Sequence, residues 1–196
     1  LLRHNLRNNL NIISGTARLI EDEMPEASDR TAVIRRTAED LLASAEKERE
    51  VIEMLTGDPG REEFDLVPTV GRCIETIRRE CPSATVETSL PETAAVFAVP
   101  ELEAAITELL ETAICHADSD RPRIELSVQV GAESVELVSK DCGPPIPPIE
   151  ADVLRGDHEM THVYHSSGLG FWLVYWTVEL SQGSVSVERS TADGNR

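Results

Sequence analysis

The sequence predicts an α+β protein in which a helical hairpin precedes a mixed α/β region. In residues 1–57, apolar side chains recur at alternating steps of three and four, the spacing of helices that pack in a bundle. After Gly60, short alternating strand patterns follow one another with amphipathic helix patterns. The 196 residues are 40% hydrophobic, which is enough apolar material to form a packed core.

The hairpin is predicted from two apolar seams separated by a break at Pro25. The seam residues are Leu6, Leu10, Ile13, Ala17, Ile20 and Met24 in the first helix, and Ile34, Ala38, Leu41, Ala45, Ile52 and Leu55 in the second. Two helices alone cover little apolar surface, so we expect two copies to pair into a four-helix bundle. The alternative is that the hairpin packs on its own downstream domain.

The α/β region is read from alternating patterns and helical spacing. Its predicted elements are a helix at 68–79, strands at 85–88 and 96–99, a helix at 102–114, a strand hairpin at 124–130 and 135–139, a loop at 141–167, a helix at 169–181 and a strand at 184–188. We therefore divide the chain into residues 1–57 and 58–196, and expect the second domain to lack its last strand.

Charge and composition exclude several classes of partner. Lysine plus arginine total 18 and aspartate plus glutamate total 36, so the net charge is 18 − 36 = −18. This balance argues against binding nucleic acid or an anionic membrane surface. The only two lysines are Lys47 and Lys140. So acidic a chain suggests adaptation to molar salt. The alternative is an acidic protein that works at ordinary salt concentrations.

Several features of the sequence predict a cytoplasmic location. The four cysteines form no CxxC pair, and no apolar run is long enough to span a membrane. The chain begins inside a helical pattern, and no signal peptide is visible in it. We expect a cytoplasmic protein without direct membrane contact from this chain, and leave open a membrane tether through a preceding region.

Polar residues that can do phosphate chemistry fall into four clusters. His4 is followed at three and four residues by Arg7 and Asn8, which share its helix face. A neutral imidazole is a nucleophile near pH 7, and a guanidinium holds a phosphoryl group.

The other three clusters lie in the α/β region. The stripe of Glu108, Thr112 and His116, spaced by four, can hold a hydrated metal and a polyphosphate, or be only a solvated face. Asp141 to Pro147 follows a strand, where an aspartate can accept a hydrogen bond from an exocyclic amine, or form only a stiff turn. Ser167-Gly168-Leu169-Gly170 opens a helix whose N–H groups can face an anion.

Taken together and in this order, the clusters resemble those of a sensor histidine kinase. His4-Asn5-Leu6-Arg7-Asn8 looks like the phosphoacceptor box, and Glu108 to Ala113 like the N box of the ATP-binding domain. Asp141 to Pro147 and Ser167 to Gly170 look like the two glycine boxes. The resemblance implies a dimeric helical hairpin followed by an α/β sandwich of the GHKL ATPase type, with a mixed sheet covered by helices on one face and a lid near 156–166.

The resemblance also implies roles for single residues. His4 would be the phosphoacceptor, with Asn5 orienting its ring and Asn8 positioning water for dephosphorylation of the partner. Glu108 and Thr112 would lie at Mg²⁺. The remaining nucleotide-binding positions would be His116, Asp141, Gly143, Ile146, Gly168, Leu169 and Gly170. The implied ligands are ATP and Mg²⁺, and the implied partners are a second copy, a response-regulator receiver domain and an upstream sensor domain.

The sequence departs from the family pattern at four positions. Thr112 replaces an asparagine, Pro145 a glycine, Asn5 a commonly acidic residue and Cys115 a commonly basic one. The first interpretation is a kinase that phosphorylates itself on His4. The alternatives are a catalytically degenerate dimeric signalling scaffold, and a phosphatase or phosphotransfer hairpin that uses His4 and Asn8 without ATP.

Overall fold

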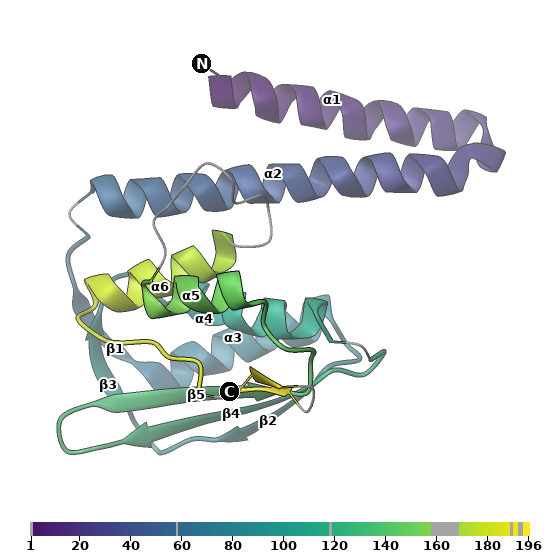
Figure 1. Cartoon of the computed structure of the whole chain (residues 1–196). Helices are drawn as coiled ribbons and strands as arrows, with labels where there is room; N and C mark the ends of the chain where they lie inside the picture. The colour runs from purple at the N-terminus through teal and green to yellow at the C-terminus, as the bar shows by residue number, and fades with distance from the viewer. Residues whose placement is uncertain (1, 58, 118, 158–168, 189, 192–193) are drawn as a thin grey trace.

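The computed structural model describes residues 2–57, 59–117, 119–157, 169–188, 190–191 and 194–196. Its chain forms three layers: a sheet, a layer of helices on one face of that sheet, and a long helical hairpin over those helices (Figure 1). The predicted fold class, a hairpin followed by a mixed sheet with helices on one face, is confirmed.

The hairpin consists of α1 (Leu2–Glu23) and α2 (Ser28–Thr56), joined by the short 3₁₀ turn η1 (Pro25–Ala27). Leu10, Ala17 and Ala38 are buried. Most of the predicted seam is not buried, because seven of its large side chains are 37–49% exposed. These are Leu6, Ile13, Ile20, Met24, Ile34, Leu41 and Leu55. One chain by itself therefore leaves much of the seam uncovered.

The second part begins with β1 (Glu62–Asp65), which pairs antiparallel with β3 (Ala95–Ala98). The main sheet has the order β2-β4-β5-β7-β6. Its strands are β2 (Thr85–Ser89), β4 (Arg123–Val130), β5 (Val135–Asp141), β6 (Ser190–Thr191) and β7 (Gly194–Asn195). β2 runs parallel to β4 and the other pairs are antiparallel, so the sheet is mixed, as expected.

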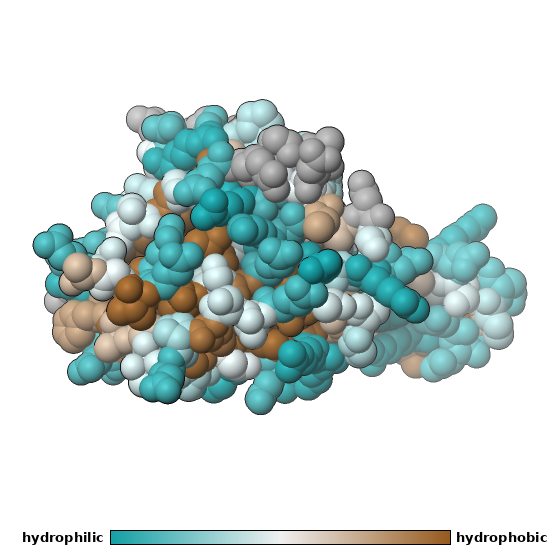
Figure 2. All heavy atoms as spheres, turned by 90° about the horizontal axis from the view of Figure 1, so that it is seen from below, coloured by the Kyte–Doolittle hydropathy of each residue, from teal (hydrophilic) through white to brown (hydrophobic). Residues whose placement is uncertain are grey.

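The helices of this part are α3 (Leu66–Glu80), α4 (Leu102–Cys115), α5 (Pro148–Arg155) and α6 (Leu169–Leu180). Helices α3 and α4 close the first core against the sheet, where Val70, Ile77, Leu110, Ile124 and Leu126 are all at most 1% exposed. The opposite face of the sheet is open to solvent and largely hydrophilic, with hydrophobic atoms visible between the polar side chains (Figure 2).

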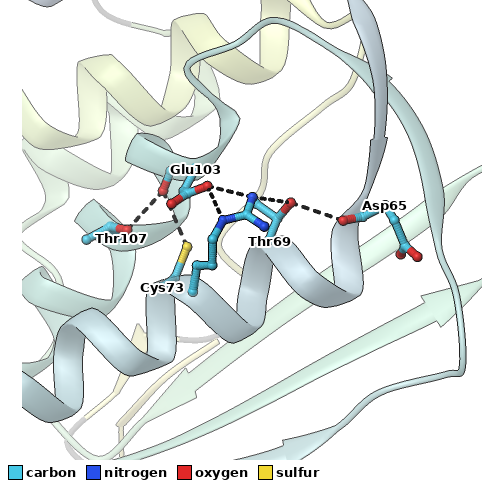
Figure 3. A network of polar contacts seen from close by, with 6 residues as sticks. Asp65, Thr69, Cys73, Glu103 and Thr107 are labelled. Atoms are coloured by element: carbon cyan, nitrogen blue, oxygen red, sulfur yellow. Dashed lines mark hydrogen bonds and ion pairs between the residues drawn. The ribbon is translucent and has the colours of Figure 1, made fainter.

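A network of hydrogen bonds and one ion pair fixes α3 against α4, the helix that carries Glu108, Thr112 and His116 (Figure 3). The guanidinium of Arg72 contacts Glu103 through Nε at 2.8 Å and through Nη2 at 2.7 Å. The carbonyl oxygen of Glu103 accepts from the Cys73 thiol and from the Thr107 hydroxyl. Burial raises the pKa of that thiol, so Cys73 acts as a neutral packing residue.

A second core joins the C-terminal half of α2 to α6. Val51 and Met54 are 1% and 2% exposed and share a buried cluster with Trp172 and Leu173. The Thr177 hydroxyl also donates to the Met54 sulfur at 3.6 Å. Neither Val51 nor Met54 belongs to the predicted seam, so the hairpin contacts its own downstream part through a face different from the seam.

Two predicted elements are wrong. The stretch 141–167 was expected to be a loop, but it contains α5, because prolines fit the first turn of a helix. Gly156, at φ 73°, ends that helix in the left-handed region. The expected strand at 184–188 makes no ladder, and β7 pairs with β5 instead. The alternating pattern around Val185 and Val187 determines which side chains face the core. It does not determine whether a neighbouring strand is there to pair with.

Candidate nucleotide site

A cavity of about 1270 Å³ runs between the sheet and helices α4, α5 and α6. Its lining extends from β3 and the β4–β5 turn to the segment after β5 and residues 181–188. Five of the residues singled out in the sequence line it: Thr112, His116, Asp141, Gly143 and Ile146. Thr112 and Ile146 are half-buried, whereas Gly143 is buried. The turn after β5 thus lies beside the C-terminal end of the α4 stripe, although 25 or more residues separate the two in sequence.

The loop after β5 is held by a hydrogen-bond network centred on Asp141. Its Oδ1 accepts from the Gly143 N–H at 2.7 Å and from Nδ2 of Asn195 at 2.8 Å. The Asn195 amide also donates to the Pro144 carbonyl at 2.9 Å, and its Oδ1 accepts from the Ile146 N–H at 3.2 Å. Asn195 is only 6% exposed, so this side chain orients both the aspartate and the loop that follows it.

Space around Gly143 in this turn is limited. A Cβ at this position would lie 3.0 Å from Asp141 Oδ1 and 3.6 Å from the His116 carbonyl oxygen. The tight contact is therefore within the loop, with the Asp141 carboxylate, whereas the distance to the end of α4 is an ordinary van der Waals contact. Asp141 and His116 line the same cavity on either side of this contact.

Glu108 lies in a different environment from the other members of its stripe. It is 7% exposed and lines a smaller cleft between α2 and α4, together with Lys47, Glu50 and Glu111. Lys47 Nζ lies 2.6 Å from Glu108 Oε2 and 2.8 Å from Oε1. Burial, followed by the charge of Glu108, raises the pKa of Glu111. The stripe is therefore divided between two sites.

A magnesium ion does not fit Glu108 and Thr112 in this arrangement. Both carboxylate oxygens of Glu108 are engaged by one ammonium group, and Thr112 adds only a hydroxyl. Within the described part of the chain, no group of three or more His, Cys, Asp or Glu side chains is placed to hold a metal.

The remaining predicted residues are placed as follows. Asn8 is exposed on α1, while His4 and Asn5 lie in the first turns of α1, where the backbone alone is described. Leu169 and Gly170 begin α6, and Gly170 is buried against the Glu108 side chain. Gly168 and residues 158–166 of the expected lid lie outside the described residues. The structure thus brings together Thr112, His116 and the loop after β5.

Residues 98–196, half of the chain, match the sequence family described as "Histidine kinase-, DNA gyrase B-, and HSP90-like ATPase". The chain belongs to this family. The match covers α4, the loop after β5 and the start of α6, which include every candidate nucleotide-binding residue predicted from the sequence. No curated protein sequence matches the chain.

Solved structures extend the likeness to the hairpin. This histidine kinase-like ATPase superimposes on full-length ShkA, whose crystal structure contains AMPPNP, with a TM-score of 0.71, 17% identity and coverage of 99% of this chain. It spans 43% of the ShkA chain. The Acinetobacter baumannii histidine kinase AdeS gives a TM-score of 0.64 at 17% identity, covering 98% of this chain and 93% of AdeS.

The mycobacterial sensor histidine kinase MprB matches at 23% identity and a TM-score of 0.57, covering 69% of this chain and 92% of MprB. At such identities the likeness is one of fold. The ATPase part and the hairpin together have the architecture of a sensor histidine kinase core. No helix in the described ranges has the length and apolar character that crossing a membrane requires.

Sequence reasoning missed two residues of this ATPase. Apart from the preceding Gly194, no sequence pattern around Asn195 indicates a role in the site. Its role depends on the pairing of β7 with β5, which joins residues 54 positions apart. Lys47 has a signal in the composition of the chain. It is one of only two lysines, and it stands between Glu46 and Glu48 in a chain that otherwise uses arginine for its cations.

Proposed function

We propose that the chain is the kinase core of a two-component sensor histidine kinase, which transfers the γ-phosphoryl group of ATP to His4 and then to an aspartate of a receiver domain. The observation that carries the proposal is the single cavity lined by Thr112, His116, Asp141, Gly143 and Ile146. The family match supports it, because residues 98–196 belong to a family of ATPases.

In this proposal the adenine is recognised by Asp141. Its Oδ1 is held by Gly143 and Asn195, so its Oδ2 accepts the hydrogen bond from the exocyclic amine. Ile146 packs against the face of the base. Leu169 and Gly170 begin α6, so the N–H groups of its first turn would bind the phosphates.

The phosphoryl transfer needs a neutral histidine. One ring nitrogen of His4 attacks the γ-phosphorus, the bond to the β,γ-bridging oxygen breaks and ADP leaves, while the proton on the other nitrogen is lost to solvent. Asn5 orients the ring through its amide. In the second step a receiver carboxylate attacks the phosphohistidine, and Asn8 positions water for the later dephosphorylation of that partner.

The uncovered seam supports a homodimer as the working form. The seven exposed seam side chains of the hairpin do not lie on the face that contacts α6. Pairing with a second copy would bury them in a four-helix bundle. An upstream sensor domain and a response regulator complete the proposed system.

The experiment that tests the function is labelling of the purified chain with γ-³²P-ATP. The unchanged chain and the matched control Asn11→Gln, an exposed amide on α1, should incorporate acid-labile, alkali-stable phosphate. His4→Gln should incorporate none, with an unchanged circular dichroism spectrum. Labelling that persists in His4→Gln would remove His4 from the mechanism, and absence of labelling in every protein would leave the signalling scaffold as the function.

A further inference from the structure

Glu150 is a buried carboxylate in the first turn of α5, and it lines the same cavity as Asp141. Only 9% of its surface is exposed. Among the residues that the structure describes, none donates a hydrogen bond to the Glu150 carboxylate or forms an ion pair with it. Burying a carboxylate to this extent is costly unless donors satisfy its oxygens, so the absence of a described partner needs an explanation.

The usual structural role of a glutamate in the first turn of a helix does not apply to Glu150. At this position a glutamate can reach back to the backbone N–H of the residue that precedes the helix. That residue is Pro147, which has no N–H to donate. The dipole of α5 favours a negative charge near its N-terminal end, but it does not itself supply a hydrogen-bond donor.

The charge of Glu150 is also not balanced by a cation of the cavity wall. Among the described residues, Arg196 is the only lysine or arginine that lines the cavity, and its Nη1 lies 2.9 Å from Glu188 Oε2. No group of acidic, histidine or cysteine side chains in the described ranges is placed to hold a metal here. An ionised carboxylate only accepts hydrogen bonds, so the group that suits Glu150 is a donor on a bound molecule.

Glu150 lies between the two ends of the proposed nucleotide site. Ile146, in the loop after β5, precedes it by four residues, which is about one helical turn. On its other side is the first turn of α6, where Phe171 lines the same cavity and shares a buried cluster with Leu154 of α5. Helices α5 and α6 pack together, and both begin on the side of the loop after β5 (Figure 1).

We propose that Glu150 binds the ribose hydroxyls of the nucleotide, so that the site selects ribonucleotides over deoxyribonucleotides. The inference rests on the proposed function, in which Asp141 accepts from the base and the first turn of α6 binds the phosphates. The ribose lies between these two groups, and its cis-diol offers two O–H donors to the two oxygens of one carboxylate. An acidic side chain on a ribose hydroxyl is also how many dinucleotide-binding proteins hold this sugar.

The first measurement is titration calorimetry of the full chain with ADP, 2′-deoxy-ADP and 3′-deoxy-ADP. The unchanged chain should bind ADP at least about tenfold more tightly than either deoxy form, because each lacks one hydrogen bond to a charged group. In Glu150→Ala the three nucleotides should bind within about twofold of one another. The matched control is Asp152→Asn on the same helix, which pairs with Arg155 at 3.1 Å outside the cavity lining and should keep the preference.

The second measurement needs no nucleotide. Glu150→Gln keeps the shape of the side chain and removes its charge. Because a buried carboxylate without a partner opposes folding, this substitution should not lower the urea midpoint of the chain in the absence of nucleotide. A lowered midpoint, with an unchanged circular dichroism spectrum, would show that the carboxylate stabilises the protein through internal donors, and it would overturn the inference.

The outcomes separate this inference from the proposed function. If ADP binds and Glu150→Ala keeps the full preference for ADP, other groups hold the ribose, and the inference is refuted while the nucleotide site stands. Equal binding of ADP and its deoxy forms to the unchanged chain would refute it in the same way. If ADP binds to none of the folded proteins, the proposed nucleotide site fails and the role of Glu150 falls with it.

Discussion

Replacing Asn195 by alanine should release the loop that carries Asp141. The substitution removes three side-chain hydrogen bonds: to Asp141 Oδ1 at 2.8 Å, to the Pro144 carbonyl at 2.9 Å, and from the Ile146 N–H at 3.2 Å. At about 1 kcal/mol for each neutral bond and somewhat more for the bond to the carboxylate, the loss is about 3 kcal/mol. Because the three bonds hold only the loop after β5, the lost free energy should appear mainly as easier opening of this loop and less as a change in global unfolding.

The assay is hydrogen exchange of the Ile146 amide in the full chain, since this N–H donates to the side chain that is removed. A loss of about 3 kcal/mol corresponds to a rise in exchange rate of roughly 150-fold. Asn195→Asp, which turns a carboxylate toward Asp141, should have at least as large an effect. Gln129→Ala, on the exposed face of β4, is the control. An Ile146 rate in Asn195→Ala that stays within threefold of the unchanged chain would refute the reasoning.

Three further substitutions test the frame around the site by urea unfolding. Leu110→Ala, at a fully buried position on α4, should lower the free energy of unfolding by about 2–5 kcal/mol. The control Val130→Ala, at a site 57% exposed, should change it by less than about 0.5 kcal/mol. Equal effects of the two substitutions would contradict the placement of the core. Asp65→Ala removes the carboxylate that accepts from one N–H in the first turn of α3 and another just before β3, at 3.1 and 3.0 Å, and should cost about 1–2 kcal/mol. Gly156→Ala adds a Cβ at φ 73° and 2.6 Å from the Tyr175 hydroxyl, and should cost about 1–3 kcal/mol; an unchanged midpoint would show that α5 ends differently.

Most helices and the central strands could be predicted because their signals are local. The spacing of Val70, Ile74 and Ile77 predicted α3, and all three are buried. The alternation in β4 and β5 predicted a hairpin, which the antiparallel register confirms. Element α5 was missed because its prolines are typical of both loops and first helical turns, and only burial of Val153 and Leu154 under α6 decides between them.

The candidate site was predictable as a set of residues but not as a geometry. The motifs around Thr112, Asp141 and Gly143 identify residues that line one cavity, because each motif is a short run of sequence. The placement of Glu108 in another cleft was not predictable. It depends on α2 lying across α4 and α6, which brings Lys47 to the carboxylate.

By itself, the sequence of this protein determined its fold class, the order of most of its helices and of its central strands, and the residue types available for phosphate chemistry. These follow from periodicity and from local motifs, which act over a few residues. The tertiary structure alone decided which charges meet. Ion pairs and buried hydrogen bonds depend on distances between elements far apart in the chain, and pairs such as Lys47 with Glu108 and Asn195 with Asp141 exist only once the layers have packed.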